Sequence, residues 1–165
     1  MLFNELELKS LTEAGEFEGW AARYSNVDSQ NDRIEPGAFA ADDGKEIPIL
    51  WQHKAEAVAG VGTLEERPEG LYLKGRLLLD TAQGREAYSR VKAGAAKGLS
   101  VGFRLIEKAV EGALRLILRG AVAEVSLTAF PANPAALVTA VKAKPGPGPC
   151  ESIHRLLAPE LYLRR

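Results

Sequence analysis

The chain has 165 residues, of which 46% are hydrophobic and 26% are charged, proportions that exclude wholesale disorder. Lys and Arg total 21 and Asp and Glu total 22, so the net charge of −1 gives no basic field that would attract nucleic acid or an anionic membrane. A single cysteine excludes an internal disulfide framework and a Cys-x-x-Cys metal site. No apolar run is long enough to cross a bilayer, and the first ten residues lack a secretory pattern, so we expect a soluble, reduced, cytoplasmic protein.

Apolar and polar residues alternate along most of the chain, which is the period of β-strands. In residues 70–79, for example, Leu71, Leu73 and Leu77 fall on one face, whereas Lys74 and Arg76 fall on the other. Many short strands in one chain indicate a barrel or a sandwich. The predicted strands are Leu2–Leu8, Phe17–Tyr24, Ile47–Gln52, Ala57–Leu64, Gly70–Leu79, Leu99–Ile106, Ala113–Arg119, Ala121–Phe130 and Ala136–Val141.

Two segments predict helices. Pro36–Ala40 favours a short helix because proline suits the first turn. Ala82–Ala96 has small and apolar residues at helical spacing and follows Asp80 and Thr81, either of which can cap a helix.

The composition changes after residue 141. The segment Lys142–Pro149 alternates proline with glycine and predicts a linker. We therefore expect a β-barrel domain over residues 1–143, followed by a linker and C-terminal tail over 144–165. The tail is either a loose tether and self-cleavage region or a packed helix, because its leucines repeat at nearly helical spacing. Cys150 and His154 lie in this tail, where nothing would hold a catalytic geometry.

Three polar residues have positions suited to catalysis. His53 ends an apolar strand, a place where a rigid scaffold can present a base, although an isolated histidine is more often structural. Ser100 opposes an apolar stripe and has Gly98 and Gly102 two residues away on its own face. These glycines leave room for another backbone, as a nucleophile and a bound peptide require, but a β-bulge would use them equally well.

Glu124 is the one carboxylate in a largely apolar strand, so it needs a partner if it is buried. An imidazole is a good candidate, and an outward, solvated glutamate is the alternative. Together the three residues fit a serine–histidine–acid set. In such a set the acid fixes the imidazole tautomer, the imidazole removes the hydroxyl proton, and the oxygen attacks a carbonyl.

Six short motifs, in order along the chain, resemble those of the prohead maturation proteases of tailed bacteriophages, which are similar to the herpesvirus capsid protease assemblin. The motifs cover most of residues 17–141. They are Phe17–Ala21, Asn31–Phe39, Ile47–His53 with Gly60–Gly62 after it, Gly70–Gly75, Gly98–Phe103 and Glu124–Pro134.

The resemblance implies a mainly β protein, a closed or nearly closed barrel with a few flanking helices. It implies that His53 is the general base and Ser100 the nucleophile. Glu124 matches the position at which the herpesvirus enzymes place a second histidine, and Asp28, Asp32 and Asp80 remain competitors for the third role. The loop Phe130–Pro134, whose sequence is typical of a tight turn, would bring Ala132 and Asn133 to the oxyanion.

The implied activity is that of a serine endopeptidase, without metal or cofactor, inside the assembling prohead in the bacterial cytoplasm. Its substrates would be the scaffolding segment and N-terminal part of the capsid protein precursor, and the protease itself. The portal protein and a homodimer stay open as partners, and no nucleic-acid or membrane role is implied. Two alternatives are a catalytically silent capsid-assembly or scaffold-binding domain and an esterase-like hydrolase.

Overall fold

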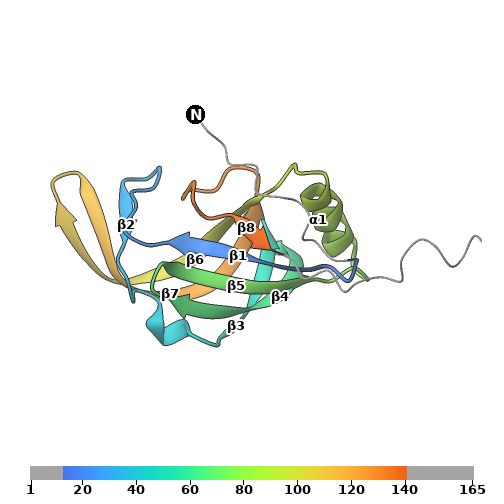
Figure 1. Ribbon diagram of the computed structural model, residues 1–165, viewed down its shortest axis with the longest axis horizontal. Coiled ribbons are helices and arrows are strands. Elements are labelled where there is room, and N and C mark those ends of the chain that lie inside the picture. The colour runs from blue at the N-terminus through green and yellow to red at the C-terminus, as the bar shows by residue number, and fades with distance from the viewer. Residues whose placement is uncertain (1–12, 141–165) are drawn as a thin grey trace, which may run out of the picture.

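The structure is a computed structural model that describes residues 13–140, in which one twisted sheet curls around the core (Figure 1). The strands are β1 (Glu16–Arg23), β2 (Asp32–Ile34), β3 (Glu46–Trp51), β4 (Lys54–Arg67), β5 (Gly70–Leu77), β6 (Gly98–Glu111), β7 (Leu114–Thr128) and β8 (Val138–Ala140). The helices are a 3-10 helix, η1 (Ala40–Asp42), and α1 (Ala82–Lys92). Within the described residues, no helix is long and apolar enough to cross a membrane.

Most of the predicted strands form where the alternation of apolar residues places them. Two predicted strands, Ala113–Arg119 and Ala121–Phe130, are instead one continuous strand, because Gly120 continues the ladder with β6 rather than ending it. Strand β2 was not predicted, since three residues are too few to show a period. The predicted strand Leu2–Leu8 and the predicted linker and tail lie outside the described residues.

Strand β7 pairs with β2, β3 and β6. One of its edges pairs in parallel with β2 near its start and with β3 near its end. Its other edge pairs with β6 in a long antiparallel hairpin, which projects from one end of the molecule in Figure 1. The remaining strands continue from β3 in the order β4, β5, β1, β8.

The expectation of a closed or nearly closed barrel is confirmed in part: the protein is mainly β and the sheet curls, but into a half-barrel that is not fully closed. Closure begins where the segment before β8 meets the start of β6: Leu99 N–H donates to the Ala136 carbonyl at 3.0 Å and Val138 N–H to the Lys97 carbonyl at 3.1 Å. Within residues 13–140, β6 then forms a ladder with β7 alone. Its far half therefore leaves the barrel with β7 as a hairpin.

Helix α1 begins as predicted but ends four residues earlier. Thr81 is the N-cap, and its hydroxyl accepts from Gly84 N–H at 3.0 Å. The helix stops at Lys92 because Gly94 adopts a positive φ of 73° and turns the chain away. The predicted helix Pro36–Ala40 is a run of turns that leads into η1. Within residues 13–140 the structure therefore has one α-helix, α1.

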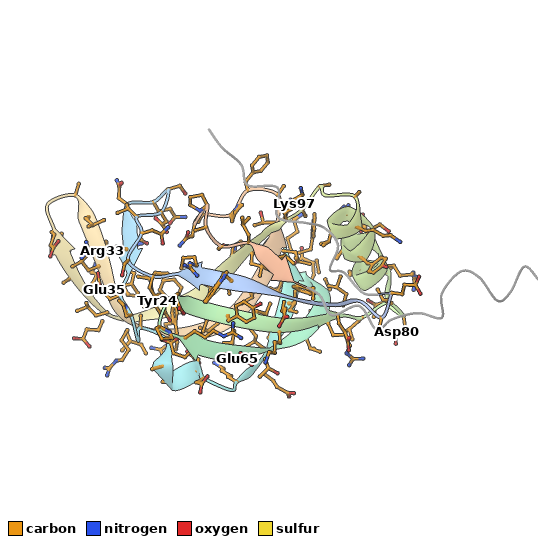
Figure 2. The ribbon with its side chains drawn as sticks, viewed as in Figure 1. Tyr24, Arg33, Glu35, Glu65, Asp80 and Lys97 are labelled. Carbon is orange, nitrogen blue, oxygen red and sulfur yellow. The ribbon has the colours of Figure 1, made fainter. Side chains whose placement is uncertain are left out.

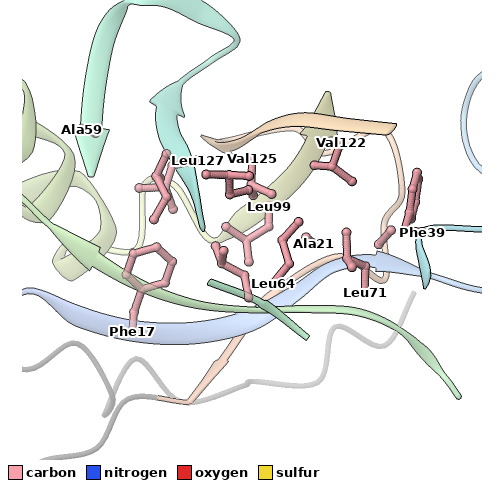
Figure 3. Close-up of a cluster of buried hydrophobic side chains, with 14 of the residues drawn as sticks. Phe17, Ala21, Phe39, Ala59, Leu64, Leu71, Leu99, Val122, Val125 and Leu127 are labelled. Carbon is pink, nitrogen blue, oxygen red and sulfur yellow. The ribbon is translucent and has the colours of Figure 1, made fainter. Parts of the chain in front are cut away.

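The core lies between the two sides of the curled sheet (Figure 3). Phe17, Leu64 and Leu71 from β1, β4 and β5 pack in one cluster with Leu99 of β6 and Leu127 of β7. All of these side chains are at least 97% buried. This packing fixes the facing directions of β6 and β7, and with them the polar residues on their opposite faces.

Candidate active site

The turn between β3 and β4 holds His53. Trp51 pairs with Lys54, and the two residues between them, Gln52 and His53, have φ values of 50° and 58°. Two positive φ values in a two-residue hairpin loop define a type I′ turn, which normally favours asparagine and glycine. Gln52 N–H donates to the Leu127 carbonyl of β7 at 3.0 Å, so the neighbouring strand holds the turn in this costly conformation.

Strand β7 lies between the strands that carry the histidine and the serine. Its register places Ser126 beside Leu50 of β3 on one edge and opposite Ser100 of β6 on the other. A side chain at the end of β3 can therefore reach across β7 to Ser100. Glu124 and Ser126 point to the same side of β7, beneath this path.

The three predicted site residues meet. His53 Nδ1 lies 2.5 Å from Glu124 Oε1, and His53 Nε2 lies 3.0 Å from Ser100 Oγ. The histidine side chain is 47% exposed, whereas the glutamate side chain is only 13% exposed. The imidazole is thus open to a substrate on one side and anchored by a largely buried carboxylate on the other.

A β-bulge directs Glu124 towards the histidine. Gly102 pairs with Glu124 but the next residue, Phe103, pairs with Val122, so β7 has one extra residue at Ala123. The bulge lets Val122 and Val125 both enter the core, although simple alternation places them on opposite faces. The carboxylate then occupies the space beside Gly102, where an added Cβ would lie 2.1 Å from Glu124 Oε1.

The two glycines around Ser100 therefore serve the protein's own groups. Gly102 makes room for the carboxylate, and Gly98 makes room for the ring of Pro131, whose Cδ would lie 2.6 Å from an added Cβ. The expectation that both leave space for a substrate backbone is replaced by these intramolecular contacts.

The competing acids make other contacts. Asp28 Oδ1 accepts from the backbone N–H groups of Gln30 and Asp32, at 2.8 and 2.9 Å. Asp32 accepts from Arg115 Nε at 2.6 Å. Asp80 lies beside the start of α1, near the end of the molecule opposite Arg33 (Figure 2). Among the described hydrogen bonds, the carboxylate that contacts His53 is Glu124.

The predicted oxyanion loop borders the same hollow as the serine and the histidine, which has a volume of about 610 Å³. The side chain of Asn133 is occupied, because its Nδ2 donates to the Arg23 carbonyl at 3.1 Å and its Oδ1 accepts from Asn26 Nδ2 at 2.8 Å. Any donor to an oxyanion from this loop would thus be a backbone N–H. A tight turn is present but lies further along the chain than expected, over residues 133–136, where Ala136 N–H donates to the Asn133 carbonyl at 2.9 Å.

Ser126 also contacts the site residues, and these contacts were not predicted from the sequence. Its hydroxyl accepts from His53 N–H at 2.9 Å and donates to Glu124 Oε2 at 2.8 Å. The available signal was its position two residues after Glu124, on the same face of the strand.

The arrangement is suited to activating the serine. If Nδ1–H donates to Glu124, the Nε2 lone pair faces Ser100 and can accept its hydroxyl proton. Within the described residues, no group of three or more His, Cys, Asp and Glu side chains could hold a metal ion.

Residues 4–146 match the sequence family described as caudovirus prohead serine protease. The chain belongs to this family. A curated relative, the prohead protease of Enterobacteria phage HK97, is 31% identical over 158 residues, which cover 87% of this chain and 68% of that protein. The capsid polyprotein of Pseudomonas phage PAJU2 is 29% identical over 149 residues, 85% of this chain but only 22% of its own length.

The fold of this prohead protease family member is similar to that of herpesvirus proteases. The KSHV protease, solved with a hexapeptide phosphonate inhibitor, superposes with a TM-score of 0.53 at 15% sequence identity. The match covers 74% of this chain and 63% of the KSHV protein, so the chain spans less than two thirds of that structure. The likeness confirms the herpesvirus-protease-like β fold, with the sheet open rather than closed.

Proposed function

We propose that this chain is a serine endopeptidase in which Ser100 is the nucleophile, His53 the general base and Glu124 the orienting acid. The observation that carries the proposal is the continuous set of contacts from Glu124 through His53 to Ser100, at 2.5 and 3.0 Å. These contacts favour an active enzyme over a silent domain of the same fold, since a silent domain has no need to align the three groups.

The reaction follows the roles of the three groups. His53 Nε2 takes the hydroxyl proton as Ser100 Oγ attacks the peptide carbonyl, and Glu124 stabilises the imidazolium that forms. The imidazolium then gives the proton to the leaving amine, and the peptide bond breaks to leave an ester on Ser100. A water molecule, deprotonated by His53, hydrolyses the ester and restores the serine.

The oxyanion of the tetrahedral intermediate needs hydrogen-bond donors near Ser100. Ala132 and Asn133 border the hollow, and no described hydrogen bond uses their backbone N–H groups. We assign the donor role to these N–H groups. Removal of an oxyanion donor typically costs about 100- to 1,000-fold in kcat, so the loop Phe130–Pro134 would contribute substantially to the rate.

A peptide is a better substrate for this site than a small ester. Beyond its first residues, within the part of the chain that the structure describes, β6 forms a ladder with β7 alone. The other edge of β6 next to Ser100 can therefore pair with an extended peptide. An esterase would instead enclose its substrate in a closed pocket.

The family and the relatives indicate the biological substrate. A prohead protease and a capsid polyprotein are the relatives, so we assign the capsid protein precursor as the substrate, with cleavage of its scaffolding segment and of the protease itself. The site of action would be the assembling prohead in the bacterial cytoplasm. The portal protein as a partner and a homodimer as the assembly stay open within this proposal.

The test is incubation of the purified chain with the cognate capsid precursor and with a p-nitrophenyl ester. We expect cleavage of the precursor, detected by mass spectrometry, and no cleavage by Ser100→Ala or His53→Ala. The double variant should be little worse than either single variant, because the two residues act as one unit. Cleavage of the ester alone would indicate an esterase, and inactivity of the wild-type protein on both would indicate a silent domain.

A further inference from the structure

Ser126 lies beneath the proposed catalytic residues and is completely buried, with an exposed fraction of 0%. It stands on β7 directly opposite Ser100 in the register of the sheet. A hydroxyl without access to solvent cannot attack a substrate carbonyl. Its position next to the site therefore calls for a different explanation from that of a second nucleophile.

The hydroxyl of Ser126 joins two parts of the site that come from different strands. It accepts a hydrogen bond from the backbone N–H of His53 at 2.9 Å. It donates its own proton to Glu124 Oε2 at 2.8 Å. No buried side-chain nitrogen or oxygen within the described residues lacks a partner, so these bonds complete the polar network under the histidine.

These two bonds form a closed ring with the contact between His53 Nδ1 and Glu124 Oε1. The histidine is thus held at its backbone and at its ring by the same strand. The bond to Oε2 fixes the rotation of the carboxylate, so that Oε1 points at the imidazole. The bond to the backbone N–H holds residue 53 at its positive φ of 58°, a conformation that is uncommon for residues other than glycine.

We propose that Ser126 is a positioning residue that orients both Glu124 and the turn carrying His53. The inference rests on the proposed function, because its effect is on the alignment of His53 with Ser100. Without the hydroxyl, the partly buried N–H of His53 and one oxygen of Glu124 lose their partner. The turn and the carboxylate then gain freedom, and the near-attack alignment is populated less often.

The test is the kinetics of peptide cleavage by Ser126→Ala. We expect kcat to fall by about 10- to 100-fold, since small misplacements of catalytic groups have effects of this size. KM should change less than about twofold, because Ser126 does not reach the substrate. The matched control is Ser89→Ala, which removes a hydroxyl that donates to the Arg85 carbonyl on α1. A kcat of Ser126→Ala within twofold of the control would overturn the proposal.

A double-mutant cycle separates positioning from a general loss of structure. In a Glu124→Ala background, Ser126→Ala should lower kcat by a smaller factor than in the wild type, because the carboxylate that it orients is already absent and only its bond to the turn of His53 remains to be lost. Equal losses in both backgrounds would contradict the proposal. If Ser100→Ala keeps its activity, the proposed function is wrong. If Ser100→Ala is inactive but Ser126→Ala keeps full activity, the proposed function stands and only the positioning role of Ser126 is wrong.

A measurement on the wild-type protein does not depend on whether the variant folds. The amide proton of His53 should exchange slowly with solvent, although it lies in a surface turn, because Ser126 accepts its hydrogen bond. The amide of Lys54 next to it provides an internal comparison. Exchange of the His53 amide at the rate of a free turn would contradict the assigned role.

Discussion

A different local feature of the backbone places each of the three side chains in the proposed site. Ser100 opposes the buried Leu99 in the strand alternation, so its hydroxyl faces away from the core. The left-handed backbone conformation of His53 in the β3–β4 turn directs its side chain, and the bulge in β7 directs Glu124. The imidazole stays exposed enough to meet a substrate, while the carboxylate beneath it is largely shielded from water. This shielding strengthens the pairing of the acid with the histidine.

Replacement of Gly102 tests the space that the carboxylate occupies. A methyl group at this position would meet Glu124 Oε1 at 2.1 Å and the carboxyl carbon at 2.8 Å. Because the obstacle is the end of a flexible side chain, we expect Gly102→Ala to displace the carboxylate from His53 rather than unfold the protein. Peptide-cleavage assays should show a loss of kcat of about 10-fold or more.

The control for this variant is Gly112→Ala, whose added methyl group meets nothing within 4 Å, although its positive φ of 62° adds some backbone strain. In thermal unfolding, Gly102→Ala should be at most about 1 kcal/mol less stable than this control. Full activity of Gly102→Ala would show that Glu124 does not need its observed position.

At the scale of elements, the site depends on the two edges of β7. Parallel pairing with β3 brings the turn of His53 to one edge, and antiparallel pairing with β6 brings Ser100 to the other. The type I′ turn matches the twist of β3 and β4, but glutamine and histidine are unfavourable residues for it. The strain is tolerated because Leu127 and Ser126 of β7 accept the two N–H groups of the turn.

The positive φ of Gln52 predicts that a residue better suited to this conformation would stabilise the protein. Asparagine is several-fold more frequent than glutamine at positive φ, so Gln52→Asn should raise the free energy of unfolding by about 0.5–1 kcal/mol, measured by urea denaturation. Activity should be unchanged because the bond from the backbone N–H to Leu127 remains. The same change at Gln30, an exposed residue without positive φ, should have no such effect. Equal effects at the two positions would contradict strain at residue 52.

The alternation of apolar residues predicts most strands because each strand has one buried face. It also predicts that Ser100 lies opposite the core, and with the motifs it brings together the three residues that the structure places in contact. The bulge at Ala123 and the turn at Gln52 were not predictable, since both depend on pairing between distant strands. The same reason applies to Ser126, whose two partners come from the turn and from its own strand.

At the scale of the whole molecule, neighbouring carboxylates on β4 affect stability in opposite directions. Burial raises the pKa of Glu66, which accepts from the Tyr24 hydroxyl at 2.5 Å. Hydrogen bonds from Lys74 and Arg67 lower the pKa of Glu65. A carboxyl with a raised pKa stabilises the fold below its ordinary pKa and loses this contribution as the pH rises. A lowered pKa has the reverse effect.

The two residues therefore predict opposite pH dependences. The ordinary pKa of both groups is 4.5. As the pH rises above this value, Glu66→Gln should gain stability relative to the wild type, because it has no charge to bury and its carbonyl still accepts from Tyr24. Glu65→Gln should lose relative stability as the pH rises, and most of the deficit should vanish as the pH falls below 4.5. Urea denaturation from about pH 3 to pH 7 measures both, and parallel curves would contradict the assignment.

The C-terminal tail provides a prediction about the limits of the folded unit. Residues 13–140 include a cluster of buried hydrophobic side chains from the strands and α1, so we expect deletion of residues 150–165 to leave a folded protein that still cleaves a peptide. Incorporation into proheads, measured by co-expression with the capsid protein, would fall if the tail is a tether. Loss of folded protein after the deletion would show that the tail belongs to the domain.

The most direct test of the account is covalent labelling of the nucleophile. The wild-type protein would be treated with a peptidyl phosphonate, and the modified residue located by tandem mass spectrometry. We predict a single adduct on Ser100, with none formed by His53→Ala, because the hydroxyl needs the imidazole to react. An adduct on Ser126 or another residue, or precursor cleavage by Ser100→Ala, would contradict it.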